Sequence, residues 1–155
     1  MQENENATAL FELMTMLNQI MFDPKMIQNV KLSKNELLIL SLVRNTDKIM
    51  MSALATAIGT SPAQITRSVT SLENKKLVQR RINPKNRRVI NVTLTVQGAA
   101  LFAQHEQAVQ LKLQQRLAHI STMDYKELNH ALQQAVSILK HSNLTTNTAD
   151  RNNVK

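Results

Sequence analysis

The sequence has no cysteine, very few glycines and prolines, and almost no aromatic side chains. Without cysteine the chain can form no disulfide, no thiolate metal site and no thiol-based oxidation sensor. Two glycines and three prolines among 155 residues favour long helices over a β-fold with many turns. Aromatic residues make up only 3% of the chain. This argues against single-stranded DNA or RNA as a ligand, because stacking on aromatic rings holds those ligands.

The chain also lacks any apolar run near the roughly 20 residues that a membrane-spanning helix needs. Its first ten residues, MQENENATAL, are acidic and polar, unlike a secretory signal peptide, so we expect a cytoplasmic protein. The length fits one domain, or one compact unit with extra helices, and a hydrophobic content of 43% is enough for a core.

Positive charge is present in excess and is concentrated in one segment. The whole chain has a net charge of +8, and residues 73–90 (ENKKLVQRRINPKNRRVI) hold seven basic side chains and one acid. Apolar residues flank a Pro-containing turn at residues 83–87, which predicts a β-hairpin. A folded cationic hairpin suits a polyanion, and double-stranded DNA is the leading candidate.

Two short helices are predicted immediately before this hairpin. The first covers residues 51–58 and ends at Gly59, a suitable C-cap. The second begins at Ser61-Pro62, with Ser61 as N-cap and Gln64 completing a capping box. Ile65, Val69 and Leu72 place one face of this second helix inward. Two short helices joined by a tight Gly-containing turn form a helix-turn-helix pattern.

The remaining elements are predicted helices and one strand. A helix at residues 7–22 carries an apolar stripe and ends near Asp23-Pro24, and another begins after Ser33, which has capping-box spacing with Glu36. Alternating apolar residues at 90–94 predict a half-buried strand. Thr95 caps a long helix to about residue 119, and a last helix covers about 124–141.

The predicted fold class is therefore mainly α with a small β-hairpin wing: a winged helix-turn-helix core plus N- and C-terminal dimerisation helices. Residues 1–31 form the N-terminal dimerisation helix, and residues 32–95 form the DNA-binding core. In that core the helix-turn-helix occupies about 51–74 and the wing about 77–94. Residues 96–141 form the C-terminal dimerisation helices, and residues 142–155 are predicted to be a disordered tail.

The second short helix of the motif has an outward face of small and polar residues. Gln64 can pair with adenine and Arg67 with guanine, each pair giving about 1–3 kcal/mol of base discrimination, while hydroxyl groups donate to phosphates. The alternative is an ordinary solvated helix face. The residues predicted to contact DNA are Ser61, Ala63, Gln64, Thr66, Arg67, Thr70, Ser71, Lys85, Asn86, Arg87 and Arg88.

Several cations allow more than one interpretation. Arg87 and Arg88 at the turn can enter the narrow, electronegative minor groove, or one of them can brace the hairpin. Lys75 and Lys76 suit either a phosphate contact or the dipole at the end of the helix.

The run from LSKNELLILSLV through SALATAIGTSPAQITRSVTSLENKKLVQRRINPKNRRVINVTLTVQGAALF resembles the MarR family of bacterial transcription regulators. The resemblance rests on the capped helix after Ser33, the Thr66-Arg67 step and the paired arginines Arg87-Arg88, in this order and spacing. It implies a dimeric winged helix-turn-helix protein, usually a repressor released by a small ligand or another signal.

Two departures from that family pattern stand out. Acidic residues are usual in the wing where this chain has Asn83 and Asn86, which predicts a more cationic, less rigid tip and stronger non-specific affinity. A glycine is usual where this chain has Lys76, and a left-handed backbone there would cost about 1 kcal/mol.

The leading hypothesis is a sequence-specific regulator of double-stranded DNA, acting as a dimer on a near-palindromic operator. A non-specific architectural DNA-binding protein is the alternative from another class, and an adaptor that uses a winged fold is the third. No phosphate loop, nucleophile motif or ordered carboxylate pair suggests an enzyme, and no cofactor is expected. Metal sensing by His105, His119, His130 or His141 is disfavoured by their spacing. An effector is expected near the first helix, the helix after Ser33 and the long helix, with no lining residues assigned.

Overall fold

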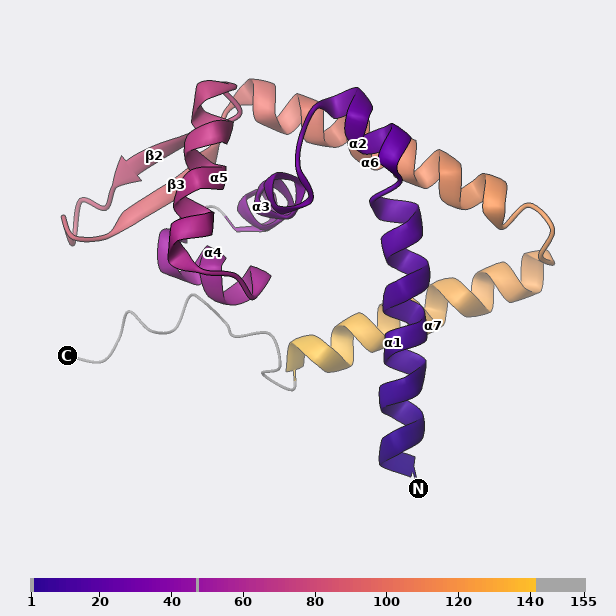
Figure 1. The fold of residues 1–155 in the computed structure, drawn as a ribbon. Coiled ribbons are helices and arrows are strands. Elements are labelled where there is room, and N and C mark those ends of the chain that lie inside the picture. The colour runs from indigo at the N-terminus through magenta and orange to yellow at the C-terminus, as the bar shows by residue number, and fades with distance from the viewer. Residues whose placement is uncertain (1, 47, 142–155) are drawn as a thin grey trace.

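A computed structural model describes residues 2–46 and 48–141, and the predicted tail lies outside them. Seven helices and three strands follow one another in this part of the chain (Figure 1). They are α1 (Gln2–Met21), α2 (Pro24–Val30), α3 (Lys34–Asn45), β1 (Ile49–Met50), α4 (Met51–Ile58), α5 (Pro62–Asn74), β2 (Val78–Ile82), β3 (Ile90–Leu94), α6 (Val96–Arg116) and α7 (Thr122–His141). Among the described residues, no helix combines the length and apolar character that a bilayer span requires.

The hydrophobic core lies where α3, α4, α5 and the sheet meet. Its fully buried side chains come from α3 (Ile39, Leu40), α4 (Leu54), α5 (Ile65, Val69, Leu72) and β3 (Val92). The predicted inward face of α5 is thereby confirmed. Phe102 of α6 packs against the same cluster, so the long helix is anchored to the core by its first turns.

The predicted helix boundaries in this core are largely confirmed. Ser33 and Glu36 form a complete capping box at the start of α3. Gly59 ends α4 in the left-handed conformation, with φ at 69°. Ser61 caps α5 by accepting a hydrogen bond from the Gln64 amide, and Pro62 occupies the first turn.

The sheet differs from the prediction in two respects. It has three strands in the order β1-β3-β2, because the two-residue β1 pairs with β3 on the side away from β2. The expected alternation along β3 is wrong: Asn91 is 5% exposed, whereas Ile90 is 41% exposed. Ile90 pairs with Ile82, which is 65% exposed, so both lie where the hairpin extends beyond the core. Burial here follows distance from the helices rather than the period of the strand.

The N-terminal region holds two helices instead of one. The first ends at Met21, as expected from the Asp23-Pro24 step, but a second begins at once. The Asp23 carboxylate accepts from the Lys25 amide and caps α2, with Pro24 in its first turn. Asp23 also pairs with Lys112, which ties the junction of α1 and α2 to α6.

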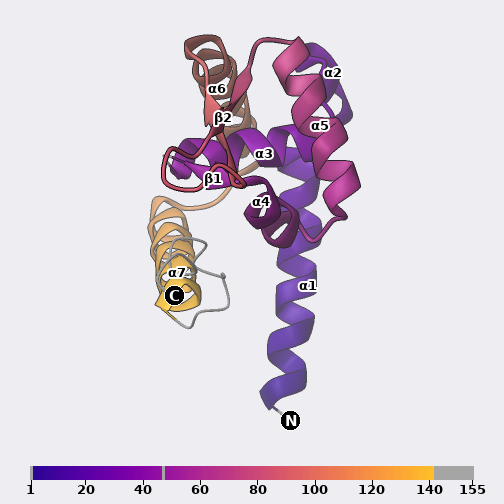
Figure 2. The ribbon, with the colours of Figure 1, turned by 90° about the vertical axis from the view of Figure 1, so that its left-hand side faces the viewer.

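The long α6 starts at the base of the wing and leads away from it. The Thr95 hydroxyl accepts from the Gly98 amide and donates to the Lys76 carbonyl at 2.7 Å, which confirms Thr95 as the N-cap. A Cβ atom at Gly98 would lie 1.9 Å from the Leu77 carbonyl oxygen, so only glycine permits this approach. Figures 1 and 2 together show α1 and α7 extending from the winged core as separate rods, crossing only in the first view.

The backbone at Lys76 is left-handed, with φ at 60°, so the condition set out for strain at this position is met. We predict that Lys76→Gly raises the free energy of unfolding by about 1 kcal/mol, because glycine adopts this conformation without Cβ strain. The Lys76 amide still donates to the Glu73 carbonyl in the variant. Urea denaturation measures the change. Lys126→Gly, in the second turn of α7, is the control and should lower stability by about 1 kcal/mol. Destabilisation by Lys76→Gly would contradict the strain argument.

Candidate nucleic-acid interface

The outward face of α5 presents the residues that were predicted to contact DNA. Ser61, Ala63, Thr66, Arg67 and Thr70 are exposed. Gln64 and Ser71 are half-buried. This surface is free of bulky apolar side chains and has the width of a single helix, so it can enter the major groove.

The two predicted base-reading residues of α5 contact each other. The Gln64 side-chain oxygen accepts a hydrogen bond of 2.9 Å from the Arg67 guanidinium. The expectation that Gln64 completes a capping box is therefore wrong in its second half: its amide group turns towards Arg67 and not back to Ser61. Because the pair spans one helical turn, the guanidinium is held along the exposed face.

The hydroxyl groups predicted to donate to phosphates already have acceptors within the protein. Thr66 donates to the Pro62 carbonyl at 2.9 Å, and Thr70 donates to the Thr66 carbonyl at 2.8 Å. Ser71 bonds to the carboxylate of Glu36 on α3. Phosphate contact by these three residues stays a prediction, and it requires their hydroxyl groups to rotate.

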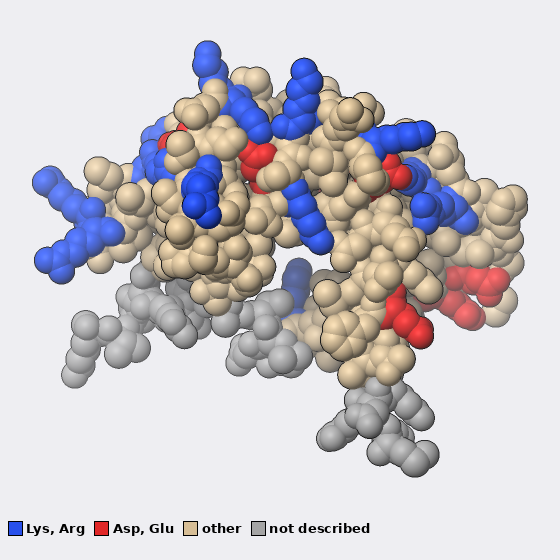
Figure 3. Space-filling model, viewed as in Figure 1, with Lys and Arg blue, Asp and Glu red and all other residues tan. Residues whose placement is uncertain are grey.

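The tip of the wing is held by its two asparagines. The Asn83 side chain accepts from the Lys85 amide at 2.9 Å, and the Asn86 side chain accepts from the Arg88 amide at 3.1 Å. Each asparagine thus forms the local turn that an aspartate would form, without the charge. The side chains of Arg87 and Arg88 are exposed and make no bond within the described chain, so no bracing contact is present there. Figure 3 shows Lys and Arg side chains projecting from the hairpin end at the left.

The residue that does brace the hairpin is Arg80, which the sequence reasoning did not single out. Its guanidinium pairs with Glu73 of α5, and its backbone amide donates to the same carboxylate at 2.9 Å. The pattern of an acid in the last helical turn followed seven residues later by an arginine in the strand is visible in the sequence. The sequence alone does not show, however, that the turn between these two residues brings their side chains together.

Lys75 is also explained by a contact within the protein. Its ammonium group donates to Glu36 at 2.8 Å and to the Lys31 carbonyl at 3.1 Å, which joins α5 to α3 and to the end of α2. Glu36 is 4% exposed. Burial alone would raise the pKa of Glu36, but hydrogen bonds from Lys75, the Ser33 amide and Ser71 outweigh it and hold the pKa below its usual range.

We predict that Lys75→Ala lowers the free energy of unfolding by about 1–3 kcal/mol at neutral pH, because a buried carboxylate loses its cationic partner. The folded pKa of Glu36 lies below its unfolded value. Its contribution is therefore present above the unfolded pKa and is lost as the pH falls through the folded one. In the variant the pKa of Glu36 rises, so the contribution of Glu36 to stability begins to be lost at a higher pH. Urea unfolding across the acid range measures both effects, with Lys126→Ala on α7 as the control. A variant as stable as the wild type at neutral pH would contradict this role.

Comparison with known proteins agrees with this geometry. A sequence model of the MarR family matches residues 32–90, from just before α3 to the first residue of β3. The chain is therefore similar to the MarR family over its winged core. The uncharacterized HTH-type transcriptional regulator YdgJ of Bacillus subtilis strain 168 is 29% identical over 97 residues. That region covers 63% of this chain and 59% of the length of YdgJ.

Two solved structures share the fold. Wild-type MarR of E. coli in its apo form matches with a TM-score of 0.68 at 24% identity, covering 81% of this chain and 96% of that one. RV1404 of Mycobacterium tuberculosis matches with a TM-score of 0.75 at 20% identity, covering 89% and 94%. The predicted fold class is confirmed. The curated relative is named as a transcriptional regulator, the class of protein that the sequence predicted.

The MarR-type fold of this chain encloses a cavity between the end of α1, α3 and α6. It measures about 550 Å³ and is lined by apolar residues that include Met21, Leu37 and Phe102. His105, 6% exposed, also lines it, and its Nδ1 atom has no hydrogen-bond partner within the described residues. Burial lowers the pKa of His105. The imidazole ring is thus part of the wall of a space of small-molecule size.

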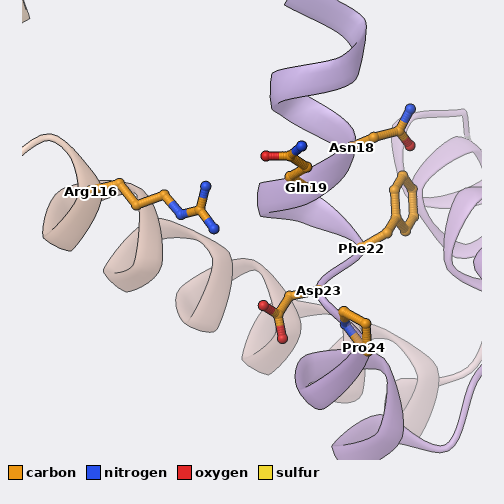
Figure 4. Close-up of a pocket in the computed structure, with 6 residues that line it drawn as sticks. All are labelled: Asn18, Gln19, Phe22, Asp23, Pro24 and Arg116. Carbon is orange, nitrogen blue, oxygen red and sulfur yellow. The ribbon is translucent and has the colours of Figure 1, made fainter.

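A second, more open cavity of about 510 Å³ lies on the other side of Phe22. Figure 4 shows Gln19 of α1 and Arg116 of α6 extending into it from opposite sides, with Asp23 and Pro24 below. Its lining includes four polar or charged side chains, those of Asn18, Gln19, Asp23 and Arg116. No group of three potential ligand side chains among the described residues is placed to hold a metal ion at either cavity.

Proposed function

We propose that this protein is a sequence-specific transcription regulator of the MarR family that binds double-stranded DNA as a dimer and represses a nearby operon. The observation that carries the proposal is the pairing of an exposed reading helix with a wing tip of unpartnered cations. Arg67 lies on the exposed face of α5, and Arg87 and Arg88 lie at the end of the hairpin that follows. A helix can occupy the major groove while the wing reaches the adjacent minor groove. The protein would act where the DNA is, in the cytoplasm.

Dimer formation is supported by the two helices outside the winged core. No described side chain of α7 is buried, and α1 has none either in the part whose side chains are described. Large apolar residues are exposed on both, and isolated helices of this kind need a partner surface. We propose that residues 1–31 and 96–141 form the dimer interface. The exposed apolar residues concerned are Leu10, Phe11, Met14, Met16, Met123, Tyr125, Val136 and Ile138.

Footprinting on the DNA upstream of the gene tests the proposal. A two-fold dimer protects a near-palindromic site whose half-sites lie about one helical turn, roughly 10 bp, apart. The affinity should fall steeply with salt, because phosphate contacts release counterions. The proposal fails if low salt reveals no protected palindrome.

The alternative is a non-specific architectural DNA-binding protein. The uncharged Asn83 and Asn86 favour this alternative, because the cations of the wing tip then have no acidic neighbours and can bind the phosphates of any duplex. Competition separates the two functions. If random DNA displaces the protein from a selected site at equal concentration, the architectural function replaces the regulatory one.

We propose further that a small-molecule effector binds the apolar cavity and releases the protein from DNA. The cavity wall is mainly apolar but includes the polar side chains of Ser41, Glu106 and Gln110, which suits a small amphipathic compound. We predict that Ser41→Trp, which fills the cavity from α3, keeps DNA affinity but abolishes release. A panel of aromatic acids and alcohols, screened for release of wild-type protein from its operator, supplies the ligand. Equal release of the variant by that ligand would contradict this location.

A further inference from the structure

We propose that Glu73 and Arg80 are positioning residues that fix the direction of the wing relative to the reading helix, and so decide whether both reach DNA at once. The inference rests on the proposed DNA-binding function and gives these two residues a role within it. Neither residue is among those predicted to touch DNA.

The Arg80 guanidinium bridges two turns of α5. One terminal nitrogen pairs with the Glu73 carboxylate, and the other donates to the Thr66 carbonyl and to the Thr70 hydroxyl, each at 3.1 Å. Thr66, Thr70 and Glu73 are spaced four and three residues apart, so they lie on one face of the helix. A planar, forked side chain is required to reach all three, which a lysine cannot do.

This bridge lies where the hairpin leaves the core. Val78, two residues before Arg80, is 3% exposed, whereas Ile82, two residues after it, is 65% exposed. Side chains two apart in a strand share a face, so the face that packs on the core at Val78 is bare at Ile82. Arg80 is thus the last described side chain of β2 with a bond to α5. The direction of the hairpin beyond Arg80 therefore depends on this contact.

The same geometry argues against direct phosphate contact by Arg80. Three N–H groups of its guanidinium are already engaged, and its side chain is 24% exposed. Arg81, the next residue, is exposed, lies on the opposite face and has no bond to its side chain within the described chain. Arg81 is therefore a matched control: it has the same charge and strand but takes no part in the bridge.

The test compares Arg80→Lys and Arg81→Lys, which both keep the net charge. The probes are the tightest duplex selected from a random pool by the wild-type protein and an unselected duplex of equal length. We expect Arg80→Lys to weaken binding to both duplexes, about tenfold for the selected one, and to make the salt dependence less steep, because the wing tip loses phosphate contacts although the net charge is unchanged. Arg81→Lys should alter neither affinity. An unchanged affinity of Arg80→Lys for the selected duplex overturns the proposal.

Glu73→Gln gives a second test, in which electrostatics and positioning predict opposite changes in the affinity for DNA. Removing an acid beside a polyanion should tighten binding if charge alone matters. If the bridge matters, binding to the selected duplex weakens about tenfold although the protein has become more cationic. Glu127→Gln on α7 controls for the charge. Tighter binding of Glu73→Gln to the selected duplex overturns the proposal, and this near-isosteric variant decides the matter if Arg80→Lys does not fold.

Two footprinting reagents separate positioning from a general loss of structure: hydroxyl radicals report the minor groove, and dimethyl sulfate reports guanine N7 in the major groove. Both bridge variants should lose minor-groove protection at the wing and keep major-groove protection at the reading helix. Equal loss of both protections overturns the positioning role. If the wild-type protein itself selects no duplex over random DNA, the regulatory function fails and positioning fails with it. If the wild-type protein does select a duplex but the bridge variants bind it as well as the wild type does, only the positioning role fails.

Discussion

Replacing both wing-tip arginines, Arg87→Ala with Arg88→Ala, should weaken binding to any DNA duplex by roughly a hundredfold at moderate salt. Each arginine is exposed and unpartnered in the described structure, so each is free to bond a phosphate or enter the minor groove. Hydrogen bonds to charged groups contribute at least about 1.5 kcal/mol each, and two of them account for a loss of this size. Because sequence is not read at these contacts, specific and non-specific affinity should fall together.

Salt titration of the same variant identifies the contacts as phosphate contacts. Losing two of them should make the dependence of log K on log salt less steep by about 1.8. The matched control is Lys126→Ala with Lys140→Ala, which removes the same charge from exposed sites on α7. If that control weakened binding as much, net charge would explain the result and the wing would have no special part.

Arg67→Ala should reduce discrimination at one base pair of each half-site by about 1–3 kcal/mol, or roughly tenfold to a hundredfold. Arg67 is exposed in the second turn of α5, where a helix in the major groove reaches base edges. Unlike the wing variant, it should affect affinity for the selected site much more than affinity for random DNA. Binding to a panel of single-base variants of that site measures the change.

The contact between Gln64 and Arg67 makes a sharper prediction possible. If Gln64 holds the Arg67 guanidinium in place, Gln64→Ala relaxes discrimination at the same base pair, and the double variant is little worse than Arg67→Ala alone. If Gln64 instead reads an adenine, the two changes relax different base pairs and their effects add. Additive effects at separate base pairs would therefore exclude the buttressing role.

The parts of the fold that the sequence predicted well are those governed by local chemistry. The Ser33–Glu36 capping box, the Gly59 C-cap and the Pro62 first turn are each settled within four residues. Such features need no knowledge of the distant chain, which is why the order of most elements could be predicted.

The parts that were missed depend on contacts between distant segments. The strand β1 has only two residues and exists because β3 passes beside it. Lys75 was assigned to phosphate or helix dipole, whereas its partner Glu36 lies 39 residues earlier in the chain. The charge count likewise overstated the free cations of the hairpin region, since two of them are neutralised by Glu36 and Glu73.

The close approach of Gly98 to the Leu77 carbonyl has a mechanical consequence. With no space for even a methyl group, the first turn of α6 and the base of the hairpin move as one rigid body. The other end of α6 lies about 30 Å away, beyond the apolar cavity. A tilt of this rod by about 10° would displace one end by about 5 Å relative to the other. If an effector binds this cavity and the wing tip binds DNA, as proposed, a small tilt of α6 on effector binding is enough to move the arginine tip away from the DNA.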